Sequence, residues 1–129
     1  MVLILEAGDW SLLLPPEWQA EQEDDGIVIG DRDGIGCLEI SELRRQEGEF
    51  SADDLEQFRE PGQPWEPVSL GSFEGRASAF VEEGAAIREW YLHAGDLLLF
   101  LTYICEEENR GMDDAAVDDM LSTLRYLPD

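Results

Sequence analysis

Acidic residues dominate the side chains that could perform chemistry in this sequence. It contains 31 Asp and Glu residues, one His and two Cys among 129 residues. Neighbouring carboxylates such as Glu82-Glu83 and Glu106-Glu107-Glu108 are the groups used in general acid–base catalysis. In a chain so rich in acids, however, such neighbours arise from composition alone. We therefore expect a protein that is not an enzyme and that carries no cofactor.

His93 is the one histidine, so a hydrolytic triad or a transition-metal site has a single candidate of this type. It ends an apolar stretch beside Ala94-Gly95, and we interpret it as an exposed turn residue. Cys37 and Cys105 are 68 positions apart, unlike the close Cys-x-x-Cys spacing of metal sites. We interpret both thiols as small buried hydrophobic side chains. A disulfide stays open as an alternative if their strands are neighbours.

The segment Asp31-x-Asp33-Gly34 superficially resembles a calcium-binding loop, and Glu42 falls at the twelfth position. The fifth position is Ile35, however, and the residues from 35 to 40 are apolar and strand-like. Asp-Gly between two such runs is also a strong hairpin signal. We therefore predict a hairpin turn rather than a metal site.

The formal net charge is −23, and all eight cations are arginine. This charge opposes binding to phosphate backbones and to anionic lipid surfaces, so nucleic-acid and membrane partners are excluded. An acidic composition without lysine is typical of halophilic proteins, in which the charge serves solvation. The alternative is that the carboxylates recognise a basic partner protein.

Leu, Ile, Val and Phe make up about a quarter of the chain, which is enough for a folded core despite the charge. The length suits one domain, which we assign to residues 1–129. The longest apolar run covers five residues, from 97 to 101, far fewer than a membrane span needs. The first residues lack the basic segment of a signal peptide, which favours a cytoplasmic location.

Alternating apolar positions and turn residues predict the elements that must position these groups. We expect strands at residues 3–5, 10–14, 26–29, 35–41, 72–82, 86–93 and 96–105. Residues 21–25 and 59–67 are predicted as loops, the second because of its prolines. Ser51 begins a helix to about residue 58, and Asp113 or Asp114 begins a final helix to about Arg125. This pattern predicts an α+β domain in which an antiparallel sheet packs against two or more helices.

Three residues are candidates for protein binding. Trp65 lies in the loop Gln63-Pro64-Trp65-Glu66-Pro67, where it covers the core or anchors a partner. Asp114 and Asp118 face away from the apolar stripe of the final helix. Their carboxylates are therefore available to a basic partner.

The segment Trp10-Ser11-Leu12-Leu13-Leu14-Pro15-Pro16-Glu17-Trp18 resembles the entry of the PsbP-like superfamily, a strand followed by Leu-Pro-x-x-Trp. The later Gly71-x-Phe73-x-Gly75-Arg76-Ala77 and Val117-x-x-Met120-Leu121-x-x-Leu124 are similar to the end of that fold. The superfamily includes bacterial DcrB-type proteins and type VI secretion effector chaperones. The resemblance implies a PsbP-like α+β fold and a small adaptor without catalytic residues.

We therefore expect a non-enzymatic adaptor or chaperone-like domain that binds another protein, either a basic one or one with an apolar helix. The alternative is an immunity or inhibitor protein that mimics nucleic acid and neutralises a basic nuclease. The oligomeric state is left open.

Salt should stabilise this protein, because the carboxylates repel one another more strongly at low ionic strength. The Debye length shrinks from ~10 Å at 0.1 M salt to ~3 Å at 1 M. We expect the melting temperature to rise steadily from low salt to about 1 M NaCl, as measured by calorimetry. A flat or falling melting temperature would contradict this.

Overall fold

The computed structural model describes residues 3–127 of the chain. Its strands are β1 (Leu3–Glu6), β2 (Trp10–Leu14), β3 (Trp18–Glu23), β4 (Gly26–Asp31), β5 (Gly36–Arg44), β6 (Glu66–Leu70), β7 (Phe73–Glu82), β8 (Ala85–Ala94), β9 (Leu97–Glu106) and β10 (Arg125–Tyr126). Its helices are α1 (Ala52–Leu55), α2 (Asp114–Leu121) and the 3-10 helices η1 (Glu56–Phe58) and η2 (Glu107–Asn109). The chain is thus an α+β protein, as the sequence predicts.

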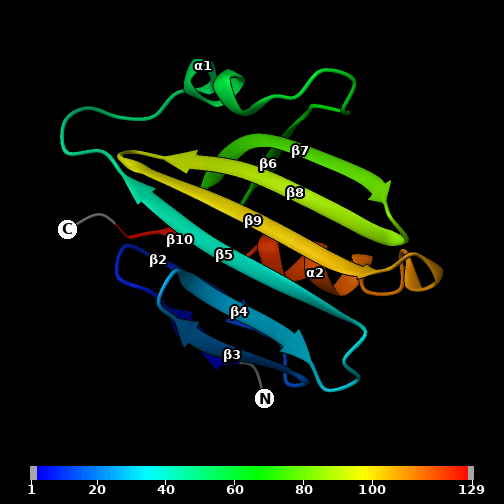
Figure 1. The fold of residues 1–129 in the computed structure, drawn as a ribbon. Coiled ribbons are helices and arrows are strands. Elements are labelled where there is room, and N and C mark those ends of the chain that lie inside the picture. The colour runs from blue at the N-terminus through cyan, green and yellow to red at the C-terminus, as the bar shows by residue number, and fades with distance from the viewer. Residues whose placement is uncertain (1–2, 128–129) are drawn as a thin grey trace.

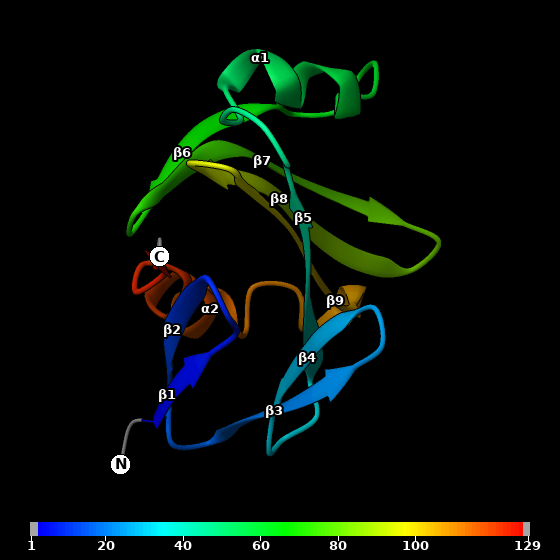
Figure 2. The same ribbon diagram turned by 90° about the vertical axis from the view of Figure 1, so that its left-hand side faces the viewer.

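The strands form two antiparallel sheets. The large sheet has seven strands in the order β3-β4-β5-β9-β8-β7-β6, and the small sheet has the order β1-β2-β10. Figure 2 shows α2 and the small sheet on the same side of the large sheet, with α1 near β6 and β7. Figure 1 looks onto the opposite side of the large sheet, which we call the open face.

Strand pairing assigns each side chain to a face, because successive residues of a strand point to opposite sides. In β8 and β9, Trp90 pairs with Leu101 and faces α2, whereas Tyr91 pairs with Phe100 and belongs to the open face. From the three central strands, the open face includes Cys37, Glu39, Ser41 and Leu43 of β5, Ile87, Glu89, Tyr91 and His93 of β8, and Leu98, Phe100, Thr102 and Ile104 of β9.

The main core lies between the covered face of the large sheet, α2 and the small sheet. The strands of the large sheet contribute fully buried residues such as Leu38, Leu92 and Leu99. The other side contributes Trp10 and Val117, among others. Burying a side chain of this size stabilises the fold by ~1.5–3 kcal/mol relative to leaving it exposed. The packing therefore uses one face of the sheet far more than the other.

Arg88 fixes α2 to the covered face. Its Nη2 lies 2.7 Å from Oδ1 of Asp118, and its Nη1 lies 3.4 Å from Oδ1 of Asp114. The guanidinium group also lies 4.7 Å from the centre of the Trp90 ring. One arginine therefore links β8 to two successive turns of the helix.

The final helix ends at Leu121, four residues before the expected end at Arg125. The hydroxyl groups of Ser122 and Thr123 donate to the carbonyls of Asp119 and Met120. Such local bonds compete with a continuing helix. The chain then pairs with β2 as the short strand β10.

Two segments expected as loops, residues 21–25 and 59–67, overlap strands at the edges of the large sheet. Residues 18–23 form β3, in which Trp18 is buried on one face while acidic side chains remain exposed. Residues 66–70 form β6 although they include Pro67. An edge strand tolerates proline because the missing amide does not interrupt a central ladder.

His93 is also placed differently from our expectation. It is 8% exposed and belongs to β8, so the imidazole is packed in the sheet instead of projecting from a turn. Cys37 and Cys105 are both free thiols. Their strands are neighbours, but Cys105 pairs in register with Gly36, so the two thiols point to opposite faces.

A buried polar pair joins β9 to the start of α2. The Tyr103 hydroxyl donates to Oδ2 of Asp113 at 2.5 Å, and both residues are more than nine-tenths buried. Gly36 makes room for this pair, since a β-carbon there would overlap the Tyr103 ring and hydroxyl. Burial raises the pKa of Asp113, and the nearby charges of Asp31 and Asp33 raise this pKa further, while the bond from Tyr103 opposes the rise.

The raised pKa of Asp113 makes its ionised form a cost to the folded state. The folded protein holds this proton more tightly than the unfolded chain, so stability from this residue is gained as pH falls through the folded pKa and lost as pH rises through it. The Asp113→Asn variant still accepts the hydrogen bond from Tyr103. We predict that the melting temperature of this variant increases relative to that of the wild type as pH rises from 4 to 7. A shift of roughly 4 °C corresponds to about 1 kcal/mol at this size.

Asp119→Asn is the matched control, since this carboxylate is exposed on the same helix. A difference between wild type and Asp113→Asn that stays constant with pH, measured by thermal melts, would show that Asp113 is not the titrating group.

Candidate protein-binding face

The open face is covered at one end by the segment that contains α1 and η1. Leu55 of α1 is fully buried, and Leu98 beneath this end of the face is 4% exposed, although neither belongs to the main core. Ser51 begins α1, and its amide donates to Oδ2 of Asp54 at 2.8 Å. Arg45 also binds Asp54, with its Nη1 2.9 Å from Oδ2. These contacts hold a short helical segment against one end of the sheet.

Aromatic rings gather where this cover ends. Tyr91 is at the centre of the group, with the ring centre of Phe58 at 5.0 Å and that of Phe100 at 4.8 Å. Both rings are stacked on it at small interplanar angles of 13° and 30°. Trp65 lies 5.5 Å from Tyr91 in a tilted arrangement, and its Nε1 donates to Glu56 at 3.2 Å.

An apolar cavity of about 310 Å³ opens beside these rings. It is lined by Ser41, Glu42, Leu43, Phe58, Tyr91, Leu98 and Phe100. Leu43 is 56% exposed at its edge. This end of the open face therefore offers aromatic and aliphatic carbon to a partner.

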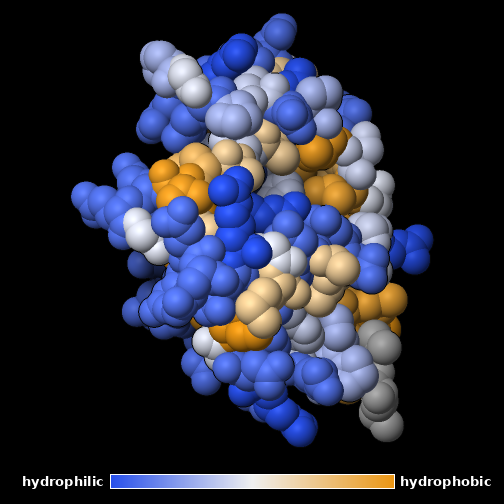
Figure 3. Space-filling model, turned by 90° about the vertical axis from the view of Figure 1, so that its right-hand side faces the viewer, coloured by the Kyte–Doolittle hydropathy of each residue, from blue (hydrophilic) through white to orange (hydrophobic). Residues whose placement is uncertain are grey.

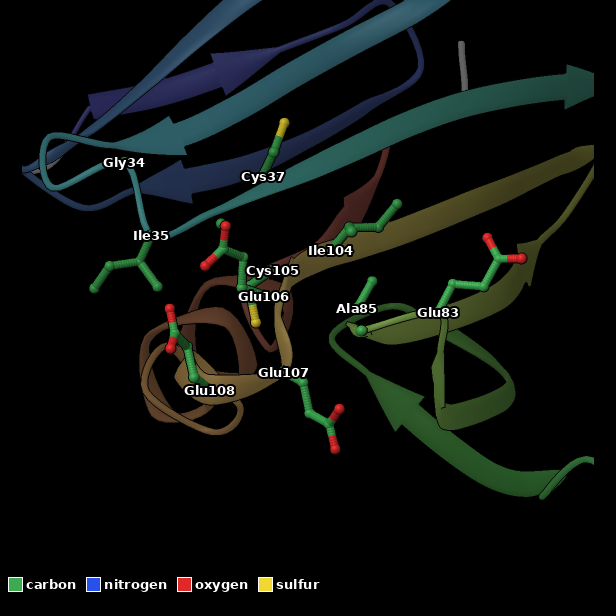
Figure 4. Close-up of a pocket in the computed structure, with 12 residues that line it drawn as sticks. Gly34, Ile35, Cys37, Glu83, Ala85, Ile104, Cys105, Glu106, Glu107 and Glu108 are labelled. Atoms are coloured by element: carbon green, nitrogen blue, oxygen red, sulfur yellow. The ribbon is translucent and has the colours of Figure 1, made fainter.

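Two further open cavities lie along the face and are acidic. One, of about 390 Å³, includes Glu23, Asp24, Asp25 and Glu39, and it shares Ser41 and Phe100 with the apolar cavity. The other, of about 790 Å³, lies at the far ends of β5 and β9 and includes Glu83, Glu106, Glu107 and Glu108. Figure 4 shows Ile104 and Ala85 between Glu83 on one side and Glu106 on the other.

The walls of these cavities carry one sign of charge. Within residues 3–127, neither arginine nor lysine lines any of the three. Glu106 and Glu108 lie so close together that a hydrogen bond between them raises the pKa of Glu108. Burial, with the charges of Glu39 and Glu23, raises the pKa of the Cys37 thiol, which keeps it protonated and weakly nucleophilic at neutral pH.

Glu89 and Tyr91, two half-buried residues of β8 on the open face, are also surrounded by negative charge. Burial raises the pKa of Glu89, and the like charges of Glu60 and Glu82 add to this effect. Burial likewise raises the pKa of Tyr91, again with help from Glu89 and Glu60. Among the described residues, Glu89 has no cationic partner. The face therefore holds carboxylates that lack counter-charges.

Glu83 adopts a backbone conformation that suits few residues. Its φ angle is 50°, and that of the following Gly84 is 84°. Hairpin turns with two positive φ angles favour Asn-Gly or Asp-Gly, and a glutamate there is strained by about 1 kcal/mol or more. Glu83, which lines the cavity of about 790 Å³, thus lowers the local stability of its turn.

The three residues predicted from the sequence lie on different sides of the sheet. Trp65 is half-buried on the open face, next to Tyr91. Asp114 and Asp118 are on α2 at the covered side and pair with Arg88. The structure therefore does not bring these aspartates together with Trp65.

Sequence reasoning missed Tyr91, Phe100 and the acidic walls. The alternation in β8 between Arg88, Trp90 and Leu92 on one side and Glu89, Tyr91 and His93 on the other was visible as a two-residue period. What the pattern lacked was the pairing of β8 with β9 and of β9 with β5, which places these side chains on one surface.

The chemistry that this surface supports is recognition. Carboxylates attract ammonium and guanidinium groups, and the exposed faces of aromatic rings do the same. Among residues 3–127, no group of three or more His, Cys, Asp or Glu side chains is arranged to hold a metal ion. In the same residues, no helix has the length and apolar character needed to cross a membrane. Figure 3 shows one side of the molecule, where hydrophilic residues surround small, separate apolar patches.

No protein-family model matches this chain, and no curated protein matches it in sequence. Solved structures do. A crystal structure from Bacteroides thetaiotaomicron VPI-5482 aligns over 99% of this chain with a TM-score of 0.72 and 17% identity. This chain spans only 48% of that protein's length.

The solution structure of cyanobacterial PsbP (CyanoP) from Synechocystis sp. PCC 6803 aligns over 97% of this chain and 92% of its own, with a TM-score of 0.53 and 12% identity. At such identities the similarity concerns the fold alone. The fold of this chain is therefore α+β and PsbP-like, with two antiparallel sheets and two short α-helices.

Proposed function

We propose that this chain is a non-enzymatic protein-binding domain of the adaptor or chaperone-like type, which holds a segment of another protein on the open face of its large sheet. The observation that carries the proposal is the composition of that face. An apolar strip of Leu43, Tyr91 and Phe100 adjoins walls of carboxylates, and among residues 3–127 neither arginine nor lysine lines these walls. The DcrB-type and effector-chaperone resemblance of the sequence is consistent with this role.

The exposed apolar side chains on this face favour contact with a partner protein over contact with water. Leu43 and Ile104 are 56% and 45% exposed on neighbouring strands. Binding sites combine such apolar anchors with a polar rim, and charged rims mainly accelerate encounter. The two free cysteines suit a reducing compartment, so we place this function in the cytoplasm.

A second candidate is an inhibitor that mimics nucleic acid and blocks a basic nuclease. The run of acids along the walls of the two acidic cavities favours it, because carboxylates could occupy the positions of phosphates. Binding of that kind depends almost entirely on charge and weakens steeply with salt. Binding through the apolar strip survives high salt.

Replacing Leu43 tests the proposal. We predict that Leu43→Ser weakens binding of a labelled helical peptide, built with leucines on one side and lysines on the other, at least tenfold. Stability should change by less than about 0.5 kcal/mol, because the side chain is more than half exposed. Fluorescence anisotropy at about 0.1 M and about 1 M NaCl measures the affinity. A loss at both concentrations supports the apolar strip as the contact.

Leu13→Ser is the matched control, since Leu13 is an exposed strand leucine in the small sheet, 42% exposed. Equal affinity of wild type, Leu43→Ser and Leu13→Ser would contradict the proposed face. Binding that disappears at about 1 M NaCl and is insensitive to Leu43→Ser would favour the inhibitor function.

Two substitutions of Glu83 distinguish its effect on stability from its effect on binding. Asparagine fits the left-handed turn position, so Glu83→Asn should raise the free energy of unfolding by about 1 kcal/mol. It should also weaken peptide binding a few-fold by removing one wall charge. Glu83→Gln removes the same charge but keeps the strain, and we expect weaker binding without the gain in stability. Denaturant melts and anisotropy measure the two effects. A stabilised Glu83→Asn with unchanged affinity would mean that Glu83 takes no part in binding.

A further inference from the structure

We infer that the occupant of the open face is an α-helix of a partner protein that carries apolar side chains at one end and a cluster of lysines or arginines about 20 Å further along. This inference rests on the proposed function and specifies the chemistry and arrangement of the bound segment. It follows from the pairing of the strands, from the position of α1 and η1, and from the different character of the two cavities at the ends of the floor.

Backbone hydrogen bonding decides in favour of a helix. The floor of the face consists of β5, β8 and β9, and each of these strands has a paired neighbour on both sides. An extended segment lying on this floor would find no free amide or carbonyl, and its own groups would lose their bonds to water. It could pair only at the sheet edges, β3 and β6. A helix satisfies its own backbone and needs only side-chain contacts.

The chain already places a helical segment on the same face. Leu55 of α1 is fully buried at one end of the sheet, and Phe58 of η1 stacks on Tyr91 at 5.0 Å. Two apolar side chains three positions apart thus pack one helical turn onto the face, together with the Arg45–Asp54 ion pair. Beyond the Tyr91 ring the floor continues uncovered towards Ile104, which is 45% exposed.

The two ends of the uncovered floor differ in chemistry. At the Leu98 end, the cavity of about 310 Å³ is lined by leucine and aromatic side chains apart from Ser41 and Glu42. At the Ile104 end, the cavity of about 790 Å³ is walled by four glutamates. Leu98 and Ile104 are six positions apart on β9, which corresponds to about 20 Å at ~3.3 Å per residue. The same length is about 13 residues of a helix at 1.5 Å each.

Charge selects the occupant of the acidic end. Glu83 approaches it from the β7–β8 turn, and Glu106 and Glu108 approach from the end of β9 (Figure 4). Within residues 3–127 neither Glu106 nor Glu108 forms an ion pair. A second copy of this chain would bring a further −23 to this surface, which opposes self-association. A cationic partner segment relieves the repulsion instead.

The experiment compares peptides of identical composition in an alanine-rich background that keeps them helical. The first has a leucine and phenylalanine block and a lysine block about 13 residues apart, the second has the blocks about 6 residues apart, and the third distributes both residue types evenly. Circular dichroism verifies equal helicity, and anisotropy measures affinity. We expect the first peptide to bind at least tenfold more tightly than the others.

Two variants locate the ends. Glu83→Gln/Glu106→Gln/Glu108→Gln should weaken the first peptide and flatten its salt dependence, whereas Leu43→Ser should weaken it equally at low and high salt. The matched control is Glu17→Gln/Glu47→Gln/Asp119→Gln, which removes the same charge from exposed positions that line none of the three cavities.

The outcomes separate this inference from the proposed function. Equal binding of all three peptides, still lost in Leu43→Ser, would overturn the two-ended arrangement and leave the binding face intact. Equal effects of the two triple variants would overturn the assignment of the basic end to Glu83, Glu106 and Glu108. Absence of binding by every peptide would count against the proposed function itself.

Discussion

Strand alternation in the large sheet is the constraint on which the rest of this structure depends. Every second side chain of β5, β8 and β9 faces α2 and the small sheet, and the others face outward. The covered side is filled with residues such as Leu99 and Trp90, so a shift of one residue in register would expose the core. The core therefore also fixes which side chains form the open face. Stability and recognition depend on the same register but use opposite sides of the sheet.

Counter-charges are unevenly distributed around the large sheet. Arg88 forms its contacts within the protein, where it pairs with Asp114 and Asp118 and packs over Trp90. Arg45 likewise pairs with Asp54 near α1. The acidic walls of the open face receive none of the arginines as lining residues within the described chain. The ion pairs of Arg88 and Arg45 thus hold helices in place, whereas among residues 3–127 no arginine lines the acidic walls, so negative potential is concentrated beside the exposed apolar side chains.

Local patterns predicted the architecture well, but they could not predict the functional surface. Asp-Gly turns and two-residue periods located most strands, and Ser51 and Asp113 marked the starts of the helices. The edge strands were missed because acids in β3 and Pro67 in β6 disguise them, and edges tolerate both. Asp114 and Asp118 were selected for facing away from the apolar stripe of their helix, but Arg88, 26 positions before Asp114, pairs with both. Partners so distant in sequence depend on strand pairing, which a single sequence does not reveal.

The small sheet has an exposed edge strand, β1. Among residues 3–127, β1 pairs only with β2, and its Leu3 and Ile4 are 57% and 68% exposed. An edge strand with such side chains is a template on which further chains can add. This strand has no proline, lysine or bulge that would block addition, so Glu6 and the mutual repulsion between highly acidic molecules are the features that oppose it. The acidity of the chain therefore opposes such addition, and protonation of the carboxylates near the acidic isoelectric point removes this electrostatic barrier at the β1 edge.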